Sequence, residues 1–505
     1  MNFIELVKKE KKFLFYLFSL ALILRLLVFV FYLSKNQNYY QVDSSMYHDI
    51  ATSIASGKGI SSTDGSPQFY RVPGYPIFLA ACYKLFTPEH KIALYIQILL
   101  ASLIPFLILL LSLVLFPLRI YLGKTVSIFS CFHLGLVLYS GFFMTESLFI
   151  LFFLLFLILF LGCFDLFFIK KGSLPNLSFA SCSDEFCQGA EFINLCEKIE
   201  EAEEKNLFRG KLFKFFFAGL FLGIASMFRP VGHYLIVLSI VILLFSNFKK
   251  IEKLWASTSL FLGWASIVSL WLIRNFVLTG YMFFHTLPGG HFLNLSASRV
   301  AMHVYDCSYW EAREILNKEA SDLILKKESE FGSKLKDIEV CDIMLGVATK
   351  YFKKYPFLSL KMWATDMLRT SLSLYSSELI YLETKEKIDY FAKGREVKSF
   401  FQKYFVPDVR SKFLKIVIYL EILMFLFILL GFFGFLIWLI FNFKYNLLNC
   451  STALKVLPFM ALFIVIALSG GYSRMRLPIE PFLMIFSFNF WLTIFPKFKF
   501  KRCMT

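Results

Sequence analysis

Charged residues are scarce in this chain. They make up 18% of its 505 residues, which is too few for the charge-rich composition of a disordered chain. Hydrophobic residues make up 58%, above the roughly 45–50% of soluble globular proteins, and the mean hydropathy is +0.64. This composition excludes a soluble enzyme and indicates an all-α polytopic membrane protein.

The sequence also lacks metal-binding and redox cysteine motifs, an internal repeat and a cleavable signal peptide. None of its ten cysteines has zinc-knuckle or CxxC spacing, so we interpret most of them as buried apolar residues. Cys307 and Cys341 are the exception, because both lie in a hydrophilic region expected on the oxidising side, where a disulfide and two free thiols are equal alternatives. The first apolar run is too long for a signal peptide and has no small-residue cleavage site.

Long apolar runs, in contrast, are abundant. A spanning helix needs about 20 apolar residues, and the runs predict about ten or more transmembrane helices. The expected spans are 13–33, 92–115, 125–142, 147–169, 214–229, 231–247, 255–275, 412–441, 453–469 and 479–495. The apolar segment 75–86 is too short to span and is expected to lie along the membrane interface.

The distribution of lysine predicts the orientation of these spans. Lys8, Lys9, Lys11 and Lys12 precede the first run, and the other basic clusters fall on the same side if the number of spans is even. Both termini are therefore expected in the cytoplasm. The net charge of +17 is then a property of inner loops, and no nucleic-acid partner is indicated.

Three regions are expected. Residues 1–276 form an N-terminal transmembrane catalytic region, which contains a first outer loop at 34–91 and an acidic inner insertion at 172–206. Residues 277–410 carry 19 Lys/Arg and 17 Asp/Glu, the composition of a small folded soluble domain on the outer side. Residues 411–505 form the C-terminal transmembrane helices.

A few polar residues stand at the outer ends of the expected spans, against the positive-inside bias. Asp43 begins an amphipathic helix, where it is either a helix N-cap or a general base just outside the membrane. Arg71 lies in a turn rich in proline and glycine, where it either snorkels or binds a lipid-linked phosphate. The other members of this group are Glu146, Arg229, Arg274, Asn275, Arg474 and Arg476. Three histidines further along, His285, His291 and His303, are interpreted as ordinary loop residues.

These residues occur in an ordered set of short motifs. They are Asp43…Tyr47…Ala51…Gly57-Lys-Gly59, Arg71-Val-Pro73-Gly74-Tyr75-Pro76-Ile-Phe-Leu79, Thr145-Glu146, Gly219…Gly223…Arg229-Pro230, Trp271…Arg274-Asn275…Gly280 and Arg474-Met-Arg476-Leu-Pro478…Pro481. The set resembles the GT-C superfamily of membrane glycosyltransferases, in particular the branch with the protein O-mannosyltransferases and the lipid A aminoarabinose transferases. The resemblance covers about 40–300 and 470–485.

The resemblance implies a function and a set of site residues. Members of the family transfer a sugar from a polyprenyl-phosphate carrier to a glycan, lipid or protein acceptor at the outer face, and the location implied is the bacterial inner (plasma) membrane. Asp43 matches the catalytic acidic residue, and Arg71 matches the residue that touches the carrier phosphate. Further phosphate-binding candidates are Arg229, Arg474 and Arg476, and other site candidates are Tyr47, His48, Glu146, Arg274 and Asn275.

The sequence departs from the family at Ser44, where many relatives have a second acid. No metal ligands are therefore assigned, although a divalent metal held by Asp43, His48 or Glu146 stays an alternative. The region 277–410 matches nothing in the family and leaves the acceptor open. Two other functions compete: a transporter or flippase, which the mid-span Arg25 favours, and an oligosaccharide polymerase or ligase.

Overall fold

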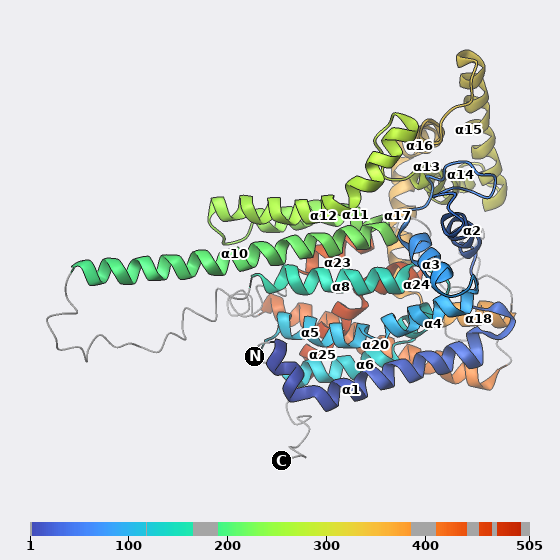
Figure 1. Cartoon of the computed structure of the whole chain (residues 1–505). Coiled ribbons are helices and arrows are strands. Elements are labelled where there is room, and N and C mark those ends of the chain that lie inside the picture. Colours follow the sequence, from blue (N-terminus) through green and yellow to red (C-terminus); the bar gives the residue numbers. More distant parts are fainter. Residues whose placement is uncertain are drawn as a thin grey trace.

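The computed structural model describes residues 3–117, 119–164, 190–384, 411–441, 454–466 and 472–495. Within this part the chain is helical, and its only β-type pairing is one isolated bridge between Ser61 and Pro67 (Figure 1). Much of the predicted insertion, residues 172–189, lies outside the described residues, as do 385–410 of the predicted outer region and the basic tail 496–505. The expectation of an all-α membrane protein is confirmed.

Most helices run side by side in one bundle (Figure 1). They are α1 (Phe3–Val28), α4 (His90–Ala101), α5 (Ile104–Leu115), α6 (Ile120–Phe132), α7 (Leu134–Gly141), α8 (Glu146–Gly162), α10 (Ala190–Phe228), α11 (Val231–Leu244), α12 (Lys250–Thr279), α20 (Lys412–Phe441), α23 (Leu457–Val465), α24 (Ser473–Arg476) and α25 (Glu480–Ile494). Helix α10 is the longest of these and extends well beyond the others at the end where α1 begins.

Six segments of the described chain are helical, long and apolar enough to cross a membrane. A seventh forms if α6 and α7, which bend by 54° at the extended backbone of His133, count as one span. The expected number of ten or more is not confirmed. The apolar helices α8 and α11 have 17 and 14 residues, and the run expected at 453–469 contains the nine-residue α23, all shorter than the roughly 20 residues of a full span.

Helices α10 and α12 approach each other closely because glycine lies at their contact. A Cβ at Gly219 would collide with the backbone carbonyl oxygen of Leu260, and a Cβ at Gly263 would collide with that of Phe216. Small residues at such contacts let helix backbones meet in lipid, where water does not drive helices together. This contact holds the C-terminal part of α10, which Arg229 directly follows.

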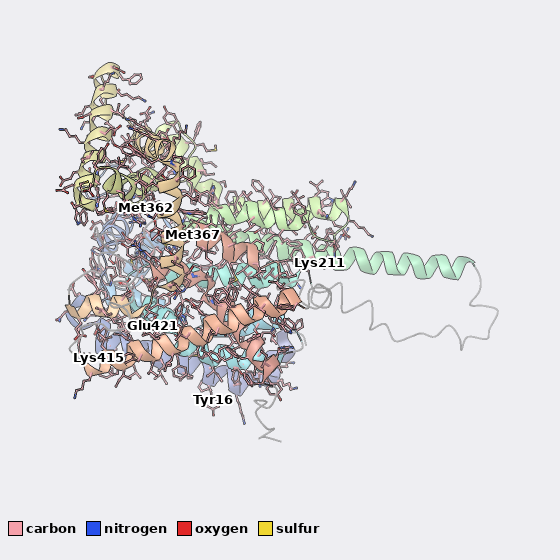
Figure 2. All side chains as sticks on the ribbon, turned by 180° about the vertical axis from the view of Figure 1, so that it is seen from behind. Tyr16, Lys211, Met362, Met367, Lys415 and Glu421 are labelled. Carbon is pink, nitrogen blue, oxygen red and sulfur yellow. The ribbon has the colours of Figure 1, made fainter. Side chains whose placement is uncertain are left out.

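The remaining helices lie at one end of the bundle (Figure 1). They are α2 (Ser44–Ala55), α3 (Gly74–Leu85), α13 (Leu287–His291), α14 (Ser298–Val304), α15 (Tyr309–Phe331), α16 (Asp337–Lys354), α17 (Pro356–Leu372) and α18 (Ser376–Thr384), with the π-turn η5 (Phe292–Ala297). Helices α14, α15 and α16 share a small hydrophobic cluster of their own, which includes Leu316 and Val347. Helix α17 runs from this group toward the bundle, with Met362 nearer to the group and Met367 nearer to the bundle (Figure 2).

Candidate active site

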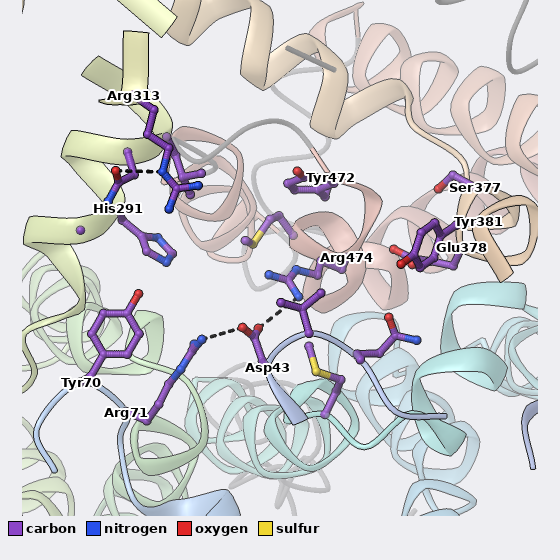
Figure 3. A pocket seen from close by; sticks show the side chains of 17 residues that line it. Asp43, Tyr70, Arg71, His291, Arg313, Ser377, Glu378, Tyr381, Tyr472 and Arg474 are labelled. Atoms are coloured by element: carbon purple, nitrogen blue, oxygen red, sulfur yellow. Dashed lines mark hydrogen bonds and ion pairs between the residues drawn. The ribbon is translucent and has the colours of Figure 1, made fainter. Parts of the chain in front are cut away.

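Asp43 directly precedes α2, but its carboxylate does not cap the helix. It faces two arginines from distant parts of the chain (Figure 3): Oδ1 accepts a hydrogen bond of 2.7 Å from Arg71 Nη2, and Oδ2 lies 3.6 Å from Arg474 Nη1. The carboxylate is 21% exposed. Asp43 at this position therefore holds two cations together and leaves the helix end unsatisfied by its side chain.

The buried Ser44 anchors the backbone of Asp43. The Ser44 hydroxyl donates to the carbonyl oxygen of Phe143 at 2.9 Å and accepts from the backbone N–H of Gln41 at 2.8 Å. The Phe143 N–H in turn donates to the carbonyl oxygen of Tyr39. These bonds join the start of α2 to the turn between α7 and α8, so Ser44 is part of the scaffold that holds Asp43.

Aromatic rings and a tight turn position Arg71. Its guanidinium lies over the rings of Tyr70 and Tyr47, at 5.1 and 5.5 Å from their centroids. Tyr47 is buried and forms the floor below Arg71. The following turn packs against the end of α10, because a Cβ at Gly74 would lie 2.5 Å from the carbonyl oxygen of Met227. Glycine is needed there for that close approach.

Arg474 is presented by α24, whose other end is fixed by Arg476. Arg476 Nε donates to Glu480 at 2.6 Å, and Nη1 donates to three backbone carbonyls, those of Thr370, Ser371 and Ser373. Glu480 also accepts from the hydroxyl of Tyr375. Arg476 is thus engaged in a buried network that joins α17, the residues between α17 and α18, and the start of α25, and it does not line the cavity.

Asp43, Arg71 and Arg474 line a cavity of about 430 Å³. Tyr70, Arg71, His291 and Arg313 lie along one side of it, and Ser377, Glu378 and Tyr381 lie along the other (Figure 3). A volume in the range of about 300–1,000 Å³ is typical of small-molecule sites. The cavity is lined by the first loop, the turn before α8 at Met144, the region after α12 and the C-terminal helices, so four distant parts of the sequence build it.

The charges around Asp43 control its protonation. Burial by itself would raise the pKa of the carboxyl, but Arg474 and then Arg71 outweigh burial and hold the pKa below its ordinary value of 3.8. Burial, with the nearby Arg71 and Arg474, lowers the pKa of His291 to about 4. At neutral pH the cavity therefore presents an aspartate carboxylate and a neutral imidazole.

Two predicted site residues form a pair just behind the cavity. Arg229 Nη1 lies 3.4 Å from Glu146 Oε1, and Arg229 Nη2 contacts the sulfur of Met475 at 3.3 Å. Met475 lines the cavity and separates this pair from it. Arg229 and Glu146 therefore support the Arg474 segment, and direct contact of Arg229 with a carrier phosphate stays a prediction.

Arg274 fastens the first loop to the end of α12. Its guanidinium lies 4.9 and 4.7 Å from the ring centroids of Phe69 and Trp271 and donates to the carbonyl oxygens of Gln68 and Ile60. Its neighbour Asn275, another predicted site residue, accepts a hydrogen bond from Arg274 and donates one to the Phe283 carbonyl oxygen. Neither side chain lines the cavity.

His48 also lies apart from the cavity. Its Nδ1 is 3.0 Å from the hydroxyl of Tyr83 and 3.0 Å from Nε2 of His90. No group of three or more His, Cys, Asp or Glu side chains in the described part of the chain could hold a metal ion. Whether a divalent metal acts here stays an open alternative.

Two cavity residues carry no local sequence signal of a site. His291, expected to be an ordinary loop residue, lines the cavity, as does Arg313 of α15. Arg313 sits in a helix whose pattern resembles any solvated amphipathic helix, and only the fold turns it inward. Of the two alternatives for Cys307 and Cys341, the structure has the free thiols, and Cys341 is buried.

Comparison with known proteins gives remote structural likeness only. No protein-family model and no curated protein sequence matches the chain. The oligosaccharyltransferase AglB from Archaeoglobus fulgidus, in complex with an inhibitory peptide and a dolichol-phosphate, is similar at 11% identity and a TM-score of 0.49, over 97% of this chain and 51% of that one. ArnT from Cupriavidus metallidurans bound to undecaprenyl phosphate is similar at 14% identity and a TM-score of 0.36, over 95% of this chain and 78% of that one.

Both neighbours are GT-C superfamily membrane glycosyltransferases, the superfamily that the sequence motifs resemble. They do not distinguish the branch that the motifs suggest. The chain spans about half the length of the oligosaccharyltransferase chains that it matches. At these identities and TM-scores the likeness carries no argument about activity, which must come from the site.

The two arginines of α24 are expected to differ in what their loss does. Arg476→Gln breaks a buried, fully bonded ion pair, which costs about 3–5 kcal/mol and should lower the unfolding temperature of the detergent-solubilised protein by several degrees. Arg474→Gln removes a partly exposed side chain from the cavity wall and should leave that temperature nearly unchanged. Equal losses in the two variants would contradict the assignment of Arg476 to the scaffold.

Proposed function

We propose that this chain is an integral membrane glycosyltransferase that moves a sugar from a polyprenyl-phosphate carrier to an acceptor, with Asp43 as the general base. One observation carries the proposal: the Asp43 carboxylate does not cap α2 and lies instead in a cavity between two arginines. Arginine forks match phosphate oxygens, and a carboxylate beside them can take a proton. A structural N-cap would need neither the arginines nor the cavity.

The reaction uses each group once. An acceptor hydroxyl or amine attacks the anomeric carbon, Asp43 accepts its proton, and the bond from that carbon to the phosphate oxygen breaks. The polyprenyl phosphate leaves with one additional negative charge, which Arg71 and Arg474 stabilise by charge-assisted hydrogen bonds. A single carboxylate base supports direct attack from the face opposite the leaving group, so the anomeric configuration inverts.

The carrier itself tunes the base. In the free protein the two arginines hold the pKa of Asp43 low, which makes the carboxylate a weak base. A phosphate that binds to Arg71 and Arg474 competes for the same donors and brings a like charge close to Asp43. Both effects raise the pKa of the carboxyl, so Asp43 becomes a stronger base once the donor is bound.

The proposal places the cavity at the outer face of the membrane and both termini in the cytoplasm. The first few turns of α1 and the inner loops carry the lysine clusters, while α2, α3 and α13–α18 lie at the opposite end of the bundle from the start of α1 (Figure 1). A bacterial inner membrane fits this arrangement. The protein meets its carrier within the bilayer and its glycan, lipid or protein acceptor at the outer surface.

Asp43→Asn should lower sugar transfer by about 10²–10⁴-fold, because the amide cannot take the acceptor proton. Membranes with a radiolabelled polyprenyl-phosphate sugar report transfer as polyprenyl phosphate released. Asp64→Asn is the matched control, since Asp64 is exposed in the same loop and its carboxylate accepts hydrogen bonds from Ser66. Full transfer by Asp43→Asn would contradict the proposal, and movement of intact carrier without release would favour a flippase.

The acid limb of kcat/KM should move when Arg474 is removed. In the wild type the limb lies below about pH 4, because the pKa of Asp43 is below its ordinary value and the carboxylate persists down to that pH. Arg474→Gln takes away the largest charge that opposes burial, so the pKa of Asp43 rises and the limb should move to higher pH. Lys58 is an exposed cation of the loop that contains Asp43, and Lys58→Gln should leave the acid limb in place.

A further inference from the structure

A third arginine reaches the same cavity from α15. Arg313 Nε donates to the side-chain oxygen of Asn294 at 3.1 Å, and Asn317 donates to that oxygen at 2.7 Å. The ring of Trp310 lies 5.6 Å from the guanidinium carbon. These contacts hold the stem and Nε of Arg313, while its remaining N–H groups stay available to the cavity that it lines (Figure 3).

Arg313 differs from the other two cavity arginines in its charge balance. Arg71 and Arg474 share the carboxylate of Asp43. Among the described residues no carboxylate lies within ion-pair distance of Arg313, which donates to the neutral amide of Asn294. A cation that is half-buried and oriented without an acid is expected to bind an anion from outside.

Counting charges in the loaded site leads to the same result. A sugar phosphodiester brings one negative charge, so Arg71, Arg474, Asp43 and the phosphodiester sum to zero. Glu378, on the opposite side of the cavity, balances Arg313 in the formal sum, but Arg313 has no acid on its own side, where it lies next to Tyr70 and His291 (Figure 3). His291 is neutral and can donate a hydrogen bond without adding charge.

We propose that Arg313, with His291 and Tyr70, forms a second anion subsite, so that the ligands of this cavity carry a second phosphate or carboxylate group besides the carrier phosphate. The inference rests on the proposed function and specifies its substrate class. The second group belongs either to the carrier, as a pyrophosphate, or to an anionic acceptor. Helix α15 then contributes directly to substrate choice.

Binding of short probes to the purified full-length protein tests the subsite without any transfer step. The probes are farnesyl phosphate, farnesyl pyrophosphate, and glucuronate or glucose 6-phosphate added to protein saturated with farnesyl phosphate. The variant is Arg313→Gln, and the matched control is Lys318→Gln, an exposed cation of the same helix outside the cavity. Loss of one charge-assisted contact should weaken a probe that uses it by about tenfold or more.

The two sources give different results. Weaker binding of farnesyl pyrophosphate, with farnesyl phosphate unchanged, supports the subsite and places the second group on the carrier. Weaker binding of glucuronate or glucose 6-phosphate supports it and places the group on the acceptor. If every probe binds Arg313→Gln as it binds Lys318→Gln, the subsite is overturned. The proposed function fails separately if Arg71→Gln binds farnesyl phosphate as tightly as the wild-type protein does.

Discussion

One carboxylate shared by two arginines is the interaction on which the site depends. Asp43, Arg71 and Arg474 come from the first loop and the last described helical segment, and each is partly shielded from water. A charge removed from water must be compensated by a partner, so this trio pins both chain segments to one place. When Asp43 releases Arg71 and Arg474, the two arginines lose their compensating charge. A phosphate can then replace the carboxylate as their partner.

The surrounding structure serves to hold these three side chains. Ser44 fixes the backbone at Asp43, stacked tyrosines orient Arg71, and the network of Arg476 and Glu480 anchors α24. Many of these contacts are buried hydrogen bonds with both partners present, which rigidify a site more than they stabilise the fold. Rigid donors need no reorganisation when charge develops on a leaving phosphate, which is the condition for electrostatic stabilisation of a transition state.

Much of this arrangement could be predicted from the sequence, and the rest could not for definable reasons. Apolar runs predict helices in lipid, where every backbone group must bond within its own segment. Asp43, Arg71 and Arg474 can be picked out because they stand at outer span ends, where the positive-inside bias does not place arginine. Arg474 and Arg476 stand two residues apart in one motif, and only tertiary packing decides which one faces the cavity. Arg313 lies in a solvated helix pattern, so no local signal marks it.

Exchange of a carboxylate for a phosphate at Arg71 and Arg474 is the central claim, and the affinity of Asp43→Asn for farnesyl phosphate tests it most directly. The account predicts that this variant binds the probe at least as tightly as the wild-type protein, because the amide no longer competes for the arginines. Binding weakened tenfold or more in a variant that remains folded would contradict it, since Asp43 would then be needed to build the anion site.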